Sequence, residues 1–149
     1  MIEFGLVLLP LLAFLFLIMD IAWICFAQSS LQHAVQVGVR AAVSGYVPTG
    51  TTHQDTYLKT IVRQNAMGFL AGDDGMNAIS ISYYDPANLS SPLSGTGSNS
   101  GGNVIEISVK NVPVSTLGPI LRASWAKVYM KASSSDVLEG SHGTSAPPR

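Results

Sequence analysis

The chain has 149 residues, of which 47% are hydrophobic and 11% carry a charge, whereas about 25% of the residues in an ordinary soluble domain are charged. The formal net charge of -1 gives no electrostatic basis for binding nucleic acid or an acidic substrate, so we do not expect those partners. The single cysteine, Cys25, excludes an internal disulfide and a thiolate metal cluster. The length allows one small domain with an appendage.

The first segment is an apolar run over residues 4–27, in which only Gly5, Pro10 and Asp20 are not plainly apolar. A helix of this length reaches about 36 Å, which is enough to cross a bilayer once. The alternative is a helix buried in a soluble core, but such helices seldom need so long an apolar run. Because a very short N-terminus precedes a long polar remainder, we expect the N-terminus inside and the C-terminus outside.

The helical pattern continues beyond this apolar run. Small and apolar residues recur every three or four positions, which predicts one helix over residues 1–45 with an amphipathic second half and a stop at Gly45. Within that half, Ala34, Gly38 and Ala42 form a row of small residues that lets another backbone approach closely. The partner of this row is a second subunit or the chain's own sheet, and both can hold on different faces of the helix.

A second, short amphipathic helix is predicted over residues 57–70, where apolar residues recur every four positions. Its expected N-caps are Thr51, Thr52 or Asp55, and its expected terminator is Gly72.

Three later runs alternate apolar and polar residues with period two, which predicts antiparallel strands at residues 79–84, 105–110 and 125–132. One face of each strand is apolar, so the helices are expected to cover one side of the sheet. The fold class is therefore α+β, with a head at residues 46–132 carried by the long helix.

Three segments are predicted to lack regular structure. Residues 85–103 are rich in Ser, Gly and Asn, which is typical of a long exposed loop. Residues 113–122 hold leucine and isoleucine between prolines and are expected to form an apolar loop or a single helical turn. Residues 133–149 are rich in Ser, Gly and Pro and are expected to form a flexible tail.

Motifs that carry catalysis or cofactor binding are absent from the sequence. The Gly-rich run at residues 95–101 lacks the dinucleotide-binding spacing and the strand-to-helix setting. None of His33, His53 and His142 has a second ligand at metal-binding spacing, and the acids at residues 73–75 lack the further ligands of a calcium loop. We therefore expect no enzymatic activity, no metal and no cofactor.

Two acids lie in the apolar part of the long helix. A carboxylate in hydrocarbon costs a few kcal/mol and usually has a partner. Glu3 either extends to the membrane surface or pairs with the N-terminal ammonium of a neighbouring subunit. Asp20 lies about 7 Å from the middle of the run, where we favour packing between subunits over placement at the lipid edge.

The residues of this helix together resemble a known family. The run EFGLVLLPLL at residues 3–12, the acid Asp20, and the small residues with Arg40 in residues 27–42 closely resemble TadE-like pseudopilins of the tight-adherence (Tad) pilus system. The later strands resemble the family in pattern only.

The resemblance implies a type IV pilin-like subunit that is inserted in the bacterial inner membrane, trimmed by a prepilin peptidase, and drawn into a pilus by a platform and an ATPase. In this comparison Glu3 corresponds to the family's acid just before Phe4. Pilin-like precursors place the acid fifth after the cut, whereas here it is third. A misassigned start, a numbering that begins inside the precursor, and unusual processing are alternative explanations.

We therefore expect a structural subunit that assembles with copies of itself or with other pilins into a cell-surface filament that supports adhesion. The sparse charge of the head agrees with a surface buried between subunits. The alternative is a membrane-tethered periplasmic binding module that does not polymerise and uses residues 85–103 as its contact surface. The residues expected to contribute to assembly or helix packing are Glu3, Phe4, Pro10, Asp20, Ala34, Gly38, Arg40 and Ala42.

Overall fold

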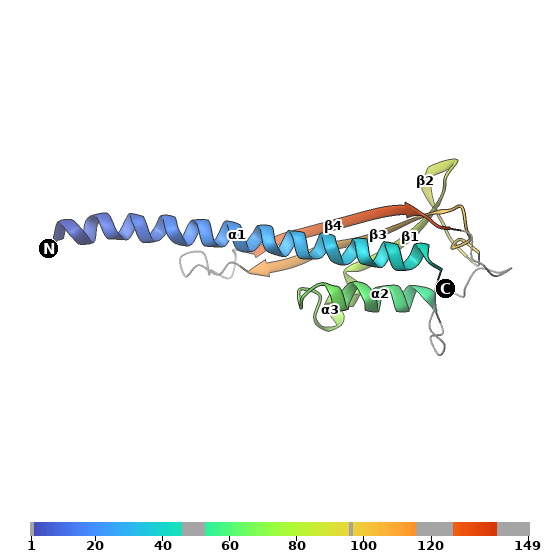
Figure 1. Ribbon diagram of the computed structural model, residues 1–149, viewed down its shortest axis with the longest axis horizontal. Coiled ribbons are helices and arrows are strands. Elements are labelled where there is room, and N and C mark those ends of the chain that lie inside the picture. The colour runs from blue at the N-terminus through green and yellow to red at the C-terminus, as the bar shows by residue number, and fades with distance from the viewer. Residues whose placement is uncertain (1, 46–52, 96, 116–126, 140–149) are drawn as a thin grey trace.

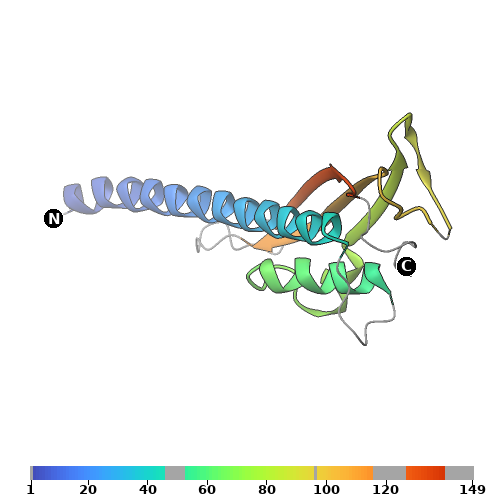
Figure 2. The ribbon, with the colours of Figure 1, turned by 45° about the vertical axis from the view of Figure 1, so that its right-hand side comes forward.

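The computed structural model describes residues 2–45, 53–95, 97–115 and 127–139. A 42-residue helix, α1 (Ile2–Val43), runs the length of the molecule, and its N-terminal part stands clear of the head (Figures 1 and 2). In the described residues the head consists of two short helices and a four-stranded antiparallel sheet. The predicted α+β class is confirmed, with one strand more than expected.

The long helix ends close to the predicted position. Gly45 has a φ of +63°, a left-handed conformation that glycine adopts without steric cost, and its amide donates to the carbonyl of Ala42 at 3.0 Å. Pro10 lies inside α1 without ending it. Because a proline has no amide hydrogen, the carbonyl of Leu6 lacks its usual donor four residues later.

The second helix differs from the prediction. α2 covers Gln54–Asn65 with His53 as its N-cap, so Asp55 lies in the first turn instead of capping it. Thr51 and Thr52 lie outside the described residues.

The predicted end of this helix at Gly72 is wrong. Met67 and Gly68 have φ values of 50° and 88°, and two successive left-handed residues end the right-handed helix. Gly72 instead begins a third helix, α3 (Gly72–Asn77).

The four strands pair in the order β2-β1-β3-β4, and every neighbouring pair is antiparallel. The three predicted strands are present as β1 (Ile79–Asp85), β3 (Val104–Ser115) and β4 (Lys127–Val137). The fourth strand, β2 (Asn88–Leu93), forms a hairpin with β1 inside the segment predicted to be a loop. All but the last of its side chains are exposed, so neither face of β2 needs apolar residues and its sequence lacks the alternation of apolar and polar residues that predicts a strand.

Two strands are also longer than predicted. β3 continues to Ser115 across an irregularity near Asn111, whose φ is 59°, so part of the expected apolar loop is a strand. β4 continues to Val137, and Ser133 pairs with Ser108 of β3. The predicted flexible tail therefore does not begin at Ser133. The rest of both segments, residues 116–126 and 140–149, lies outside the described residues.

The core of the head lies between α1, α2 and one face of the sheet. Polar contacts also link α2 to the rest of the head: Tyr83 Oη donates to Asp55 Oδ1 at 2.8 Å, and Asn99 Nδ2 donates to Gln54 Oε1 at 2.7 Å. Both bonds join residues distant in the sequence and hold α2 beside the sheet. The largest fully buried apolar side chains are Leu31, Val35, Leu58, Val62, Leu70, Ile79, Tyr83, Ile105, Ile107 and Val109.

Candidate membrane and assembly surface

The N-terminal part of α1 exposes large apolar side chains. Every residue over positions 3–15 is exposed except Gly5, which is partly buried. α1 contains an apolar window of 18 residues, long enough to cross a membrane, of which 6% is buried inside the structure. A helix in the core of a soluble protein would be mostly buried. We call residues 3–19 of α1 the free segment, and its exposed apolar surface indicates a partner outside the chain.

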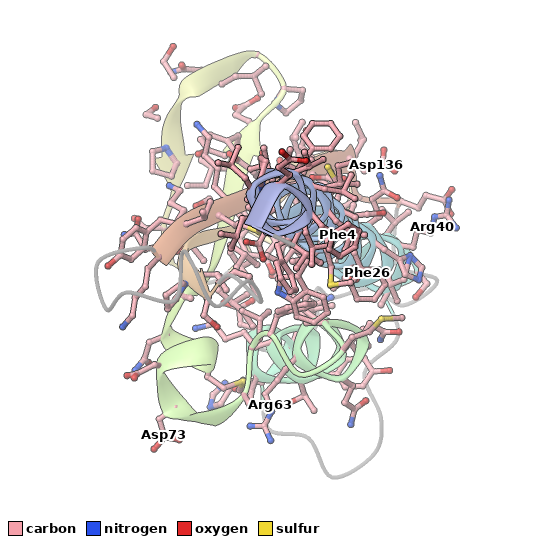
Figure 3. The ribbon with its side chains drawn as sticks, turned by 90° about the vertical axis from the view of Figure 1, so that its left-hand side faces the viewer. Phe4, Phe26, Arg40, Arg63, Asp73 and Asp136 are labelled. Carbon is pink, nitrogen blue, oxygen red and sulfur yellow. The ribbon has the colours of Figure 1, made fainter. Side chains whose placement is uncertain are left out.

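Three of the predicted assembly residues lie on the free segment. Glu3 and Pro10 are exposed, and Phe4 is 72% exposed. Viewed along the helix from its N-terminus, Phe4 projects from the near end of α1 (Figure 3). None of the three contributes to the core of the head.

Asp20 lies at the boundary between the free segment and the head. It is only 3% exposed, whereas its neighbours Met19 and Ile21 are about half exposed. The Asp20 carboxylate also has an interaction partner within this chain. The fold of one chain therefore shields this acid from lipid before any second subunit arrives, which neither of the two sequence-based interpretations anticipated.

The row of small residues packs inside the chain. Ala34 and Ala42 are buried, and a Cβ built on Gly38 would lie 2.5 Å from Cγ2 of Val62 in α2 and 3.3 Å from Cδ1 of Ile107 in β3. Of the two alternatives for this row, the structure therefore supports packing against the chain's own α2 and sheet. Arg40 is exposed and projects sideways from α1 (Figure 3).

Two glutamines that the sequence analysis did not single out attach α1 to the edge of the sheet. Gln28 Nε2 donates to the carbonyl of Lys131 at 2.8 Å, and Gln32 Nε2 donates to the carbonyl of Ser133 at 3.0 Å. They lie one helical turn apart and bind alternate carbonyls of the edge strand β4. A groove of about 840 Å³ runs beside them between α1 and β4. In the sequence, the feature that could have indicated these bonds is the pair of glutamine amides at positions i and i+4 on one face of the helix.

An aromatic cluster marks the place where α1 enters the head. The ring centroid of Trp23 lies 5.8 Å from that of Phe26 and 5.7 Å from that of Phe69, and Phe26 and Phe69 are 6.3 Å apart. Phe69 comes from the turn after α2, so the cluster joins segments more than 40 residues apart. Helical spacing alone could not show that these rings meet.

Comparison with known proteins identifies the part of the chain that carries this surface. Residues 1–40 match the family model described as TadE-like protein. Over these residues the chain is similar to the TadE-like family. No curated protein and no solved structure matches it. The TadE-like match covers the free segment, Asp20, Ala34, Gly38 and Arg40, and it ends before Ala42, so the head is characterised by the structure alone.

The chain shows no cluster of metal ligands within its described residues. No group of three or more His, Cys, Asp or Glu side chains there is placed to hold a metal ion. His33 is exposed on α1, His53 precedes α2, and His142 lies outside the described part. The TadE-like family, which residues 1–40 match, is structural.

Proposed function

We propose that this TadE-like chain is a single-pass membrane protein that serves as a structural pseudopilin of a Tad pilus. The observation that carries the proposal is the free segment, which is apolar and exposed although the head already has a core of its own. Such a segment needs two successive environments. Lipid surrounds it before assembly, and helices of neighbouring subunits surround it in the filament.

The free segment has the features that helix association in an apolar medium requires. Lipid chains are as apolar as leucine, so association depends on close packing and on polar contacts. A Cβ built on Gly5 would meet nothing within 4 Å, which leaves space for a neighbouring helix at that position. Phe4 and Pro10 lie on the same exposed segment. We assign these three residues to contacts between subunits.

Glu3 supplies the polar contact in this proposal. It is exposed at the end of an apolar helix, where a carboxylate gains most from a cationic partner. The N-terminal ammonium of a neighbouring subunit is such a partner, and pairing with it would fix the register of the two helices. Asp20, Ala34, Gly38 and Ala42 support the fold of each chain, while Arg40 is exposed for contact with a neighbour.

The partners follow from the family. We propose insertion in the bacterial inner membrane with the N-terminus inside, extraction by the pilus platform and its secretion machinery, and assembly with copies of this chain or with other pilins. No enzymatic step is part of this function. Adhesion would then be carried by the heads displayed on the filament.

The decisive experiment is electron microscopy of filaments sheared from cells, labelled with an antibody against the head. Labelled filaments support the proposal. A protein found only in membranes, in cells that make filaments, would instead support the tethered, non-polymerising module. The variant Glu3→Leu should insert normally and reduce filament yield, whereas Arg63→Leu, a charge change on α2, should leave the yield unchanged.

A further inference from the structure

Four apolar side chains gather at the end of the head that faces the free segment. Trp23 and Phe26 come from α1, and Met67 and Phe69 come from the turn after α2; we call them the basal cluster. The three rings contact one another as described above. Ser30 Oγ donates to the sulfur of Met67 at 3.7 Å, which holds the methionine beside α1. The cluster is therefore an organised surface built from two distant segments.

This surface remains open in the single chain. Met67 is 67% exposed and Phe26 is 47% exposed, while Trp23 and Phe69 are half-buried. In the view along α1 from its N-terminus, Phe26 lies between α1 and α2 (Figure 3). Both exposed side chains are large and apolar, so water is an unfavourable environment for them.

The backbone gives no local reason for a methionine at position 67. Its φ of 50° lies in the left-handed region, where glycine, asparagine and aspartate are accommodated best. A methionine there costs conformational energy and also exposes apolar surface to solvent. Such a combination is typical of a residue whose environment lies outside the chain.

The length of the free segment places this surface at a defined depth. Trp23 lies about 20 residues after Glu3, so the helix rises about 30 Å between them, which equals the thickness of the hydrocarbon core of a bilayer. If Glu3 lies at one surface of the membrane, Trp23 lies at the other. The turn after α2 lies on the side of the head toward the free segment, where the end of β3 reaches still further along α1 (Figures 1 and 2).

We propose that the basal cluster rests in the headgroup region of the bilayer, so that the head contacts the lipid surface through Phe26, Met67 and Phe69 before assembly. This inference rests on the proposed membrane insertion of α1. Tryptophan favours this interface because it combines an apolar ring system with a polar N–H group, and the apolar side chains beside it gain from leaving water. Continuity with the membrane-crossing helix identifies lipid as the occupant.

Site-directed spin labelling of the full chain tests this placement. In a Cys25→Ala background, single cysteines at Met67, Leu11 and Leu89 carry the label, and the chain is reconstituted at high dilution in phosphatidylcholine vesicles. Leu11 is 59% exposed in the middle of the free segment, and Leu89 is 61% exposed in β2 at the opposite end of the head. Accessibility to oxygen, which concentrates in lipid, is compared with accessibility to a water-soluble nickel complex.

The label at position 67 should favour oxygen over the nickel complex severalfold more than the label at position 89, and less than the label at position 11. If position 67 is as accessible to nickel as position 89 while position 11 is in lipid, the basal cluster does not contact the membrane. The inference is then wrong, whereas the proposed membrane insertion of α1 is still supported. If position 11 is also accessible to nickel, membrane insertion fails as well. Low accessibility to both reagents at position 67 would show that protein covers the cluster and would overturn the inference.

A second measurement separates lipid contact from folding. The variant Met67→Asn suits the left-handed backbone and should leave the thermal unfolding temperature of the head in detergent unchanged or raised. The same variant should shift a spin label at position 69 (Phe69→Cys, in the Cys25→Ala background) toward water. A label at position 69 that keeps its oxygen preference in the Met67→Asn chain would show that Met67 does not help to seat the head on the membrane.

Discussion

Gly38 of α1 and Val62 of α2 pack so closely that a Cβ on the glycine would lie 2.5 Å from Cγ2 of the valine. Ile107 of β3 would lie 3.3 Å from the same Cβ, so the glycine is enclosed by two elements of the head. The close approach of α1 and α2 therefore depends on the missing side chain at position 38. This contact connects the long helix, which the family model matches over residues 1–40, to the part of the head that the model does not cover.

The variant Gly38→Ala should consequently destabilise the head. The added methyl group must push Val62 or the helix aside, and overpacking of this kind costs about 1–3 kcal/mol, partly offset by the higher helix propensity of alanine. Chemical unfolding of the full chain in detergent micelles, followed by near-ultraviolet circular dichroism, measures this change.

Gly5→Ala provides the matched control because it is the same substitution in the same helix. A Cβ at position 5 would meet nothing within 4 Å, so the head should keep its stability in this variant. Equal stability of the wild-type chain and Gly38→Ala would mean that α2 can move away from α1 without cost, contrary to the packing described here.

The sequence supported the prediction of α1 and of three strands because their side chains carry a periodic pattern. It could not tell whether the small residues around Gly38 face a second subunit or the same chain, since both partners need the same close approach. The sequence did not predict β2 or the end of β4. Both segments are paired through their backbones, but their exposed or small polar side chains show no alternation of apolar and polar residues. The basal cluster could not be predicted from the sequence either, because Phe69 lies beside Trp23 only in the folded chain.

The bond between Tyr83 and Asp55 leads to a second prediction. Tyr83 is fully buried and donates to a carboxylate that is only partly buried, so Tyr83→Phe removes one hydrogen bond while water can still solvate the acid. We expect a loss of about 1 kcal/mol in the free energy of unfolding. Tyr84→Phe, the neighbouring position on the opposite face of β1, should change it by less. In a double-mutant cycle with Asp55→Ala the two losses should not add, and strict additivity would argue against the bond.

The two glutamines on α1 should protect the edge strand of the sheet. Gln28→Ala and Gln32→Ala each remove a donor to a β4 carbonyl, and we expect each to weaken local stability by about 0.5–1 kcal/mol. Hydrogen exchange monitored by mass spectrometry should show faster exchange in β4 and unchanged exchange in β1. Gln36→Ala is the control, since Gln36 lines the same groove. If Gln36→Ala accelerates exchange in β4 as much as the other two variants, the effect belongs to the groove as a whole.

The length of β4 leads to the last prediction, which concerns where the chain can be shortened. Residues 133–137 pair with residues 104–108 of β3, and Leu138 is 4% exposed in the core. Truncation after Ala132 therefore removes five pairings and a buried leucine, whose burial alone contributes about 2 kcal/mol. Truncation after Glu139 retains all of these contacts and should leave the unfolding midpoint unchanged. Because a domain of this size is marginally stable, the shorter chain should lose cooperative unfolding and become sensitive to protease. Equal protease resistance of the two truncated chains would mean that the end of β4 contributes nothing to the fold, and that the structured head ends at Ala132.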